Sequence, residues 1–405
     1  MKIVFLSHYF PRLPVFEHHG SWALDQAIAI SENHKITVIT IKPKVYWFMK
    51  VLSKQYRKWA SVYNDIKINE NLTVLYVEVS PFLFKARELL YRYPNLLSSL
   101  FFRKYIKDIV TTEPDLLIGN HTLIEGLVCE KISEKYNIPY IVFEHSSDDF
   151  IPRNKRHNST YQDIINNAVS FVNVSKYSEE CIGKYYNFVN VNCKVLYNYS
   201  KDAKQQEEIM INKDLFVFDK EKKYLLNISA YDEKKNQLCL VDFFTENIND
   251  LDDWELLIVG GYSNYYDIIK KYIEERALSN KIHLITNCPH NQVLDILKKV
   301  DIFVLPSESE MFSVAVLEAL SAGLPVVVTS KNGTSDKVFD QYSLVRFDPD
   351  RPDIMNNELM KLIKNENTRE AIGINNRKLY EDYFTYDKYV IRMKELIKDA
   401  LELSH

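Results

Sequence analysis

The stretch "PSESEMFSVAVLEALSAGLPVVVTS", residues 306–330, predicts a strand, a loop, a helix and a second strand in succession. The run before it, "DIFVLPS", reads as a strand that ends at Pro306, so residues 307–311 form a loop at its carboxyl end. Ser313 is a suitable N-cap for the helix, and Gly323 a suitable residue to end it. The valine-rich run that follows predicts the next strand. Such a unit is typical of a parallel sheet covered by helices.

Two glutamates in this stretch point to a ligand. Glu310 falls in the predicted loop, and Glu318 in the second turn of the helix. Side chains of a helix lean toward its N-terminus, so Glu318 can face the opening that Glu310 borders. Free N–H groups and the helix dipole attract an anion there. A site in which backbone amides bind phosphate and carboxylates bind hydroxyl groups would suit a sugar nucleotide. The alternative is that both glutamates face solvent and bind no ligand.

Apolar strands and helices alternate in the same way along the rest of the chain, in two separate sets. We expect an α/β protein with two doubly wound, Rossmann-like domains: residues 1–200, then a polar linker over 201–223, then residues 224–384. A closing amphipathic helix is expected at about 385–405. The predicted strands are "KIVFLS", "KITVIT", "DLLIG", "YIVFEHS" and "FVNVS" in the first half, and "YLLNIS", "ELLIVGG", "IHLIT", "DIFVLPS" and "PVVVTS" in the second.

Composition excludes several classes of protein. Hydrophobic residues make up 46% and charged residues 26% of 405, which indicates a globular chain. Residues 1–200 carry 24 basic against 19 acidic side chains, and residues 201–405 carry 27 against 36, too little positive charge for a dedicated nucleic-acid binder. We expect no signal peptide and no spanning helix. Five scattered cysteines indicate reduced thiols in the cytoplasm rather than disulfides or a zinc framework.

The Glu-to-Glu stretch resembles the donor-site signature of retaining glycosyltransferases of the GT-B fold. This large family, glycosyltransferase family 4-like or group 1, includes sucrose and glycogen synthases and many bacterial polysaccharide glycosyltransferases. The resemblance covers nearly the whole chain. It also includes "MKIVFLSHYFP", "IPYIVFEHSSDDF", "VLYNYSKD", "LLIVGG" and the closing "YEDYFTYDKYVIRMKELIKDAL", which in the family packs back onto the first domain.

The resemblance implies roles for individual residues in the second half of the chain. Glu310 matches the glutamate that contacts the transferred sugar, and Glu318 the one that binds the ribose hydroxyl groups. Lys235, in "NISAYDEKKNQ", matches the lysine that neutralises the leaving diphosphate. The remaining donor-binding positions that it implies are Met311, Phe312 and Ser313, through backbone N–H groups, and the loop glycines Gly260 and Gly333.

In the first half, His145 matches the histidine beside the reacting carbon, and Gly20 the loop that approaches the phosphates and the acceptor. The family's reaction moves a sugar with retention from a nucleotide-diphosphate sugar to a glycan or lipid-linked acceptor, across a cleft between the domains and without a metal. Bacterial surface polysaccharide or glycolipid assembly is the setting that the resemblance implies.

One departure keeps other functions open. The family usually has an arginine five residues before the lysine, and Ala230 stands there in this chain. A sugar-nucleotide-binding partner subunit with little catalysis is therefore an alternative, and a GT-B sugar-nucleotide epimerase is another.

The stretch "KVYWFMKVLSKQYRKW" predicts one basic amphipathic helix with aromatic residues along its apolar face. Lys50, Lys54, Arg57 and Lys58 form the basic side, which suits an anionic membrane surface. We therefore expect a cytoplasmic protein with peripheral contact at the inner face of the cytoplasmic membrane. The alternative is an apolar stripe facing the core, with solvated lysines. The apolar positions at helical spacing are Val45, Phe48, Leu52, Tyr56 and Trp59.

Overall fold

The computed structural model describes residues 1–15, 20–90, 94–145, 158–207, 211 and 215–402. The chain forms two compact units. The first contains Met1–Val174, Ser178–Leu196 and the end of the chain from Val390; the second contains Ser175–Tyr177 and Tyr197–Tyr389. Residues 201–223, expected to be a linker, belong to the second unit, where Ala203 and Ile211 are buried in its core.

The first unit is built on one eight-stranded sheet with the order β3-β4-β2-β1-β5-β6-β7-β8. All neighbours are parallel except β3, which pairs antiparallel with β4. The strand order reverses between β1 and β5, so the sheet has a topological switch point there. The strands are β1 (Lys2–Leu6), β2 (Lys35–Pro43), β3 (Asp65–Lys67), β4 (Leu72–Val79), β5 (Leu116–Asn120), β6 (Tyr140–Glu144), β7 (Ser170–Asn173) and β8 (Cys193–Val195).

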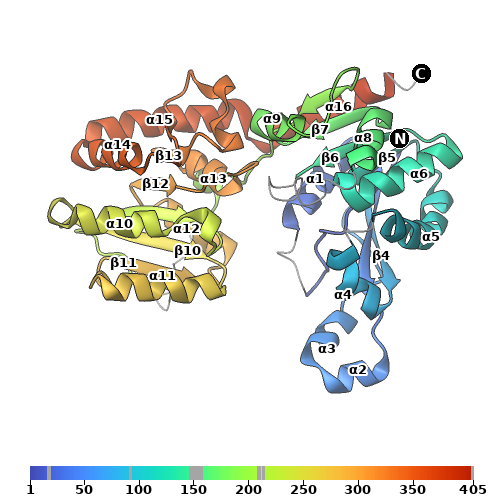
Figure 1. The fold of residues 1–405 in the computed structure, drawn as a ribbon, viewed down its shortest axis with the longest axis horizontal. Helices are drawn as coiled ribbons and strands as arrows, with labels where there is room; N and C mark the ends of the chain where they lie inside the picture. Colours follow the sequence, from blue (N-terminus) through green and yellow to red (C-terminus); the bar gives the residue numbers. More distant parts are fainter. Residues whose placement is uncertain (16–19, 91–93, 146–157, 208–210, 212–214, 403–405) are drawn as a thin grey trace. The chain divides into compact units, whose positions relative to one another are not determined.

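Helices connect these strands, because parallel neighbours need a crossover (Figure 1). The central strand β5 is buried along its whole length, which explains the apolar run with which it begins. The helical segments are α1 (Ser21–Ser31), α2 (Trp47–Leu52), α3 (Lys54–Ala60), α4 (Pro81–Leu90), α5 (Pro94–Thr112), the π-helical turn η1 (Thr122–Gly126), α6 (Leu127–Tyr136), α8 (Asn158–Asn167) and α9 (Lys176–Gly183). The C-terminal helix α16 (Tyr386–Glu402) follows no strand of this sheet, and its residues from Val390 onward belong to the first unit.

The second unit has a six-stranded, fully parallel sheet with the order β11-β10-β9-β12-β13-β14. In chain order this is 3-2-1-4-5-6, the order of dinucleotide-binding sheets, and the switch point lies between β9 and β12. The strands are β9 (Lys223–Ile228), β10 (Trp254–Gly260), β11 (Ile282–Thr286), β12 (Ile302–Leu305), β13 (Val326–Thr329) and β14 (Val345–Phe347).

Both faces of the second sheet are covered. Successive residues of β9 belong to opposite cores: Leu225 packs with α10, α11 and α14, whereas Leu226 packs with α12, α13 and α15. Figure 1 shows these helices around the sheet. They are α10 (Leu238–Glu246), α11 (Asn264–Glu275), α12 (His290–Leu297), α13 (Val314–Ala322), α14 (Pro352–Lys364) and α15 (Glu366–Tyr383), with short 3₁₀ turns at η3 (Ala203–Gln205), η4 (Glu233–Lys235), η5 (Ile248–Asp250), η6 (Gly333–Ser335) and η7 (Lys337–Phe339).

The single basic helix expected over residues 44–59 is wrong. Ser53 is extended (φ −147°, ψ 129°), so the segment breaks into α2 and α3. The apolar stripe is divided as well: Trp59 packs on Phe84 with ring centroids 5.0 Å apart, whereas Leu52 is 80% exposed. Within the described ranges, no helix is long and apolar enough to cross a membrane.

Candidate functional site

The loop after β12 is held by the loop after β13. The N–H of Glu310 donates to the carbonyl of Lys331 (2.9 Å), and the N–H of Gly333 donates to the carbonyl of Glu310 (3.0 Å). A Cβ at Gly333 would lie 2.0 Å from the carbonyl oxygen of Met311 and 2.4 Å from Ser175 Oγ. Gly333 is therefore required by the close approach of these backbones.

Two of the predicted site residues meet at the switch point of the second sheet. Lys235 lies in η4, after β9, and its Nζ forms an ion pair with Glu310 Oε1 in the loop after β12. Ser307 Oγ donates to the same oxygen (3.2 Å). The backbones of the two loops are also joined, since the N–H of Glu308 donates to the carbonyl of Lys234 (2.9 Å). A cation and a carboxylate, both part-buried, are thus fixed where doubly wound sheets bind ligands.

The expected helix after this loop is confirmed. Ser313 is the N-cap of α13, with Oγ accepting from the N–H of Val316, and Gly323 ends the helix in the left-handed conformation (φ 75°). The ring of Phe312 packs near Tyr197 and Phe384, with centroids 6.0 and 6.1 Å away. Met311 is buried, and its carbonyl accepts from Ser175 Oγ (2.7 Å).

Glu318 has a partner that the sequence did not suggest. Glu318 is only 5% exposed, and its Oε1 lies 2.6 Å from Nε2 of His290, the first residue of α12. The two predicted glutamates therefore have different neighbours, a lysine for Glu310 and a histidine for Glu318. The position of His290 just past β11 was the available signal, because functional side chains gather where parallel strands end.

The glycine at the end of β10 has a structural explanation. A Cβ at Gly260 would lie 2.2 Å from the carbonyl oxygen of Ser229. The end of β10 therefore packs directly on the segment after β9, and a glycine is needed there whether or not a ligand binds.

In the first unit, His145 directly follows β6. Its Nε2 lies 2.9 Å from Asn120 Oδ1, and its ring is 4.3 Å from that of Trp22 and 5.4 Å from that of His121. Burial, and to a smaller extent His121, lowers the pKa of His145 well below its usual value. The imidazole is therefore neutral near pH 7 and can accept as well as donate a hydrogen bond.

Gly20 starts α1. It has a left-handed backbone (φ 75°), and a Cβ there would lie 2.3 Å from the carbonyl oxygen of Tyr9. The left-handed backbone and the close approach to Tyr9 both require glycine at this position. The start of α1 therefore lies against the segment after β1. Gly20 and His145 thus lie in the first unit, whereas the other predicted catalytic and donor-binding residues lie in the second.

A scan against protein families matches residues 210–379 to the family described as "Glycosyl transferases group 1". The match covers the loops of Lys235 and Glu310. Among characterised folds, the chain is similar to sucrose-phosphate synthase of Thermosynechococcus elongatus, with a TM-score of 0.81, 14% identity and 99% of each chain covered. It is also similar to HepE of Anabaena in complex with UDP and glucose, with a TM-score of 0.70, 16% identity and 98% and 99% of the chains covered.

Relatives that are similar in sequence point to the same class of protein as the structural similarities. An uncharacterized glycosyltransferase of Methanocaldococcus jannaschii is 25% identical over 295 residues, 72% of this chain and 78% of the relative. A UDP-Gal:alpha-D-GlcNAc-diphosphoundecaprenol alpha-1,3-galactosyltransferase of Escherichia coli is 29% identical over 171 residues, 42% of this chain and 43% of the relative. The expected α/β fold with two Rossmann-like sheets is confirmed as GT-B. Within that class, residues 210–379 match the group 1 glycosyltransferases, and the chain is related to glycosyltransferases of this kind.

Proposed function

We propose that this chain transfers a sugar from a nucleotide-diphosphate sugar to a glycan or lipid-linked acceptor, with retention of configuration. The observation that carries the proposal is the pair formed by Lys235 and Glu310 at the switch point of the second sheet, inside the segment that matches group 1. The second unit then binds the donor, and the first unit, with His145 and Gly20, binds the acceptor. Uridine nucleotides are the first donors to test, because the similar HepE structure holds UDP and glucose.

The chemistry of the site fits this reaction. Departure of the nucleoside diphosphate builds negative charge on phosphate oxygens. Lys235 and the backbone N–H groups of residues 311–313, at the start of α13, stabilise that charge. Glu310 accepts hydrogen bonds from hydroxyl groups of the sugar, and Glu318, oriented by His290, accepts them from the ribose.

Donor hydrolysis tests the proposal. Wild type is incubated with UDP-, GDP-, ADP- and CDP-sugars beside Glu310→Gln and, as the matched control, Glu308→Gln, whose exposed side chain lies two residues away. We expect slow release of one nucleoside diphosphate by wild type and control, and a loss of about 100-fold in Glu310→Gln. Equal rates in Glu308→Gln and Glu310→Gln would contradict the role of Glu310.

A second candidate function is a sugar-nucleotide-binding subunit that acts with a catalytic partner. Ala230 favours it, because this exposed residue supplies no cation where the family usually has an arginine. Its carbonyl accepts a hydrogen bond from Gln237 Nε2 (2.7 Å). Saturable binding of one donor, with neither hydrolysis nor transfer to any acceptor, would support this second function.

We also propose that α2, α3 and the start of α4 contact an anionic membrane at the cytoplasmic face. Trp47, Val51, Leu52 and Phe82 are 75–82% exposed. All four basic residues predicted for this surface are exposed on the same two helices: Lys50 on α2, and Lys54, Arg57 and Lys58 on α3. Exposed apolar side chains among lysines match the interfacial region of an anionic bilayer.

Flotation with vesicles of phosphatidylglycerol and phosphatidylcholine tests this surface. Reversal of Lys50, Lys54 and Arg57 to glutamate should abolish flotation. Reversal of Lys270 and Lys271, exposed lysines of α11 in the second unit, is the control and should leave it unchanged. Unchanged flotation in the first variant would reject this surface as the membrane contact.

A further inference from the structure

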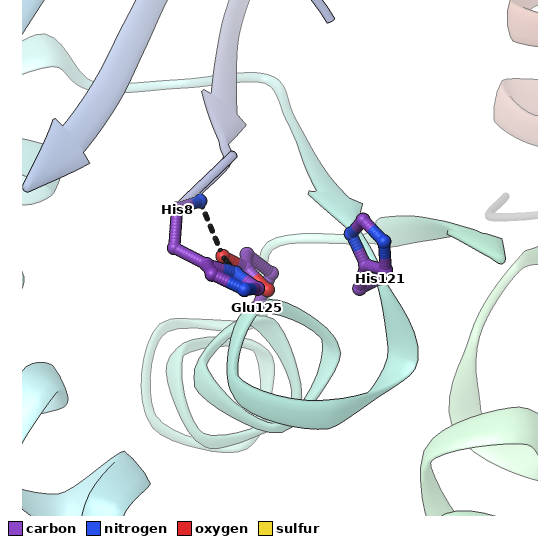
Figure 2. Close-up of side chains that lie close together, drawn as sticks. All are labelled: His8, His121 and Glu125. Carbon is purple, nitrogen blue, oxygen red and sulfur yellow. Dashed lines mark hydrogen bonds and ion pairs between the residues drawn. The ribbon is translucent and has the colours of Figure 1, made fainter. Parts of the chain in front are cut away.

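Three side chains that the sequence analysis did not single out meet in the first unit. His8 lies just after β1, His121 just after β5, and Glu125 in the following turn η1. Nitrogen and oxygen atoms of all three lie within 4.8 Å of one another. Figure 2 shows them grouped where the two strands end. Because the order of the sheet reverses between β1 and β5, the cluster lies at the switch point, where doubly wound sheets bind ligands.

His8 and Glu125 are held firmly. The backbone N–H of His8 donates to Glu125 Oε1 (2.6 Å), and a second hydrogen bond joins His8 Nδ1 to the same oxygen (2.5 Å). Both residues are nearly inaccessible, at 2% and 3% exposure. The guanidinium of Arg12 donates to the carbonyl of His8 (2.5 Å), which fixes the backbone of the loop.

The second oxygen of Glu125 is the unexplained atom of the cluster. Oε2 is buried and has no hydrogen-bond partner in the part of the chain that the structure describes. A buried carboxylate oxygen without a partner is costly, because it has lost its hydration and gained nothing in return. A cation bound beside this oxygen would remove the cost.

His121 completes a donor set typical of a transition metal. Its Nδ1 is hydrogen-bonded to the carbonyl of Asn120, which leaves Nε2 as the nitrogen available to a ligand. A metal-binding histidine usually donates its other ring N–H to a carbonyl or carboxylate in this way.

We propose that His8, His121 and Glu125 form a binding site for one divalent transition-metal ion, with Zn²⁺ as the best match. Two imidazole nitrogens and one carboxylate are a common three-residue zinc set, which leaves a fourth position for water or another oxygen. Thiolates are absent from this set and hard-oxygen ligands are few, so neither copper(I) nor Ca²⁺ fits as well. The ion would join the loop after β1 to the turn after β5, beside the ring of His145. The sugar-transfer reaction proposed above does not depend on it.

The competing explanation is a metal-free pair in which His8 and Glu125 share one proton. A direct measurement of metal binding distinguishes this metal-free pair from the proposed metal site. Full-length chain without a polyhistidine tag is stripped with a chelator and titrated with Zn²⁺ against a chromophoric competitor. We expect one ion per chain, and at least about tenfold weaker binding in His121→Asn, in which the least buried of the three ligands is removed.

Two control variants make the result specific. His283→Asn removes a histidine that is paired with Glu255 (2.8 Å) in the second unit and has the same His–Glu chemistry without a second histidine. The double variant His18→Asn/His19→Asn removes a neighbouring pair that lies outside the described residues. Both should bind one ion with wild-type affinity. Loss of binding in the double variant, with binding kept in His121→Asn, would overturn the proposal.

The visible spectrum of bound Co²⁺ is a second measurement, and it does not depend on any variant being folded. Co²⁺ bound to wild type should give the visible absorption of a four-coordinate site with nitrogen ligands, and Zn²⁺ should displace it. Zn²⁺ should also raise the Tm of wild type and of His283→Asn, because an ion that binds only the folded chain stabilises it. No saturable binding of Zn²⁺ or Co²⁺ by wild type, or equal affinity in His121→Asn, would refute the site.

Discussion

Nε2 of His290 lies 2.6 Å from Oε1 of Glu318, although the two residues belong to different helices of the second unit. Glu318 is almost fully buried, whereas the His290 side chain is 45% exposed. The histidine therefore orients a buried carboxylate while part of its own side chain remains accessible to solvent.

This pair predicts a specific kinetic defect. His290→Ala should raise the KM for the donor about tenfold with little change in kcat, because ribose binding is used equally in the ground state and the transition state. His290→Gln, which can still donate to Glu318, should recover most of the affinity. Steady-state kinetics with the donor identified by hydrolysis provides the measurement, and a drop in kcat alone would contradict a positioning role.

Gly333 and Gly261 give a matched pair of substitutions. Gly333→Ala places a methyl group 2.0 Å from the carbonyl oxygen of Met311, so the loops after β12 and β13 must separate. We expect a loss of about 1–3 kcal/mol in the free energy of unfolding and weaker donor binding. Gly261→Ala meets nothing within 4 Å and should stay within about 0.5 kcal/mol of wild type in urea unfolding.

Much of the fold could be predicted because the strands are short apolar runs at the centre of parallel sheets. Strand β5 begins with three consecutive apolar residues and is buried along its whole length between β1 and β6, as a central parallel strand should be. The helix after β12 was equally clear: Ser313 caps it with a side-chain hydrogen bond, and Gly323 ends it in a conformation that glycine adopts easily.

Side-chain pairs across loops were harder to predict. Lys235 and Glu310 are 75 positions apart, and only the order of the sheet brings the ends of β9 and β12 together. The same holds for His8 and Glu125, which are 117 positions apart. The prediction of one basic helix failed at a single residue: Ser53 has an extended backbone and separates α2 from α3, and the helical spacing of the apolar residues gave no sign of it.

The two tryptophans of that segment predict opposite outcomes. Trp47 is 79% exposed, so Trp47→Ala should weaken flotation with anionic vesicles and leave stability unchanged. Trp59 packs against Phe84 and the core of the first unit, so Trp59→Ala should lower the free energy of unfolding by about 1–3 kcal/mol. Flotation and urea unfolding measured on both variants check the pair. A destabilised Trp47→Ala would mean that the residue is covered in solution.

The buried carboxyl group of Asp301 should make the stability of the chain depend on pH. Burial raises its pKa, although the N–H of Tyr224 donates to its Oδ2 (2.8 Å). The folded chain therefore keeps the Asp301 proton more readily than the unfolded chain does, so stability falls as pH rises from about 4 through the raised pKa. Asp301→Asn should be more stable than wild type at pH 7, with a smaller difference at pH 4. Asp253→Asn, at an exposed position, should show no such trend in urea unfolding.

Lys235 should matter most for the departure of the nucleoside diphosphate. Lys235→Met keeps the length of the side chain and removes the cation, while the hydroxyl group of Ser307 still donates to Glu310. We expect a loss of about 100-fold to 1000-fold in kcat with a smaller change in donor KM, because negative charge grows on the phosphate only as the bond breaks. Donors with better leaving groups should lose less, since they need less stabilisation by the cation. Lys361→Met, at an exposed position of α14, is the control and should match wild type. If kcat fell equally for all leaving groups, Lys235 would instead act on donor binding or on folding, through its ion pair with Glu310.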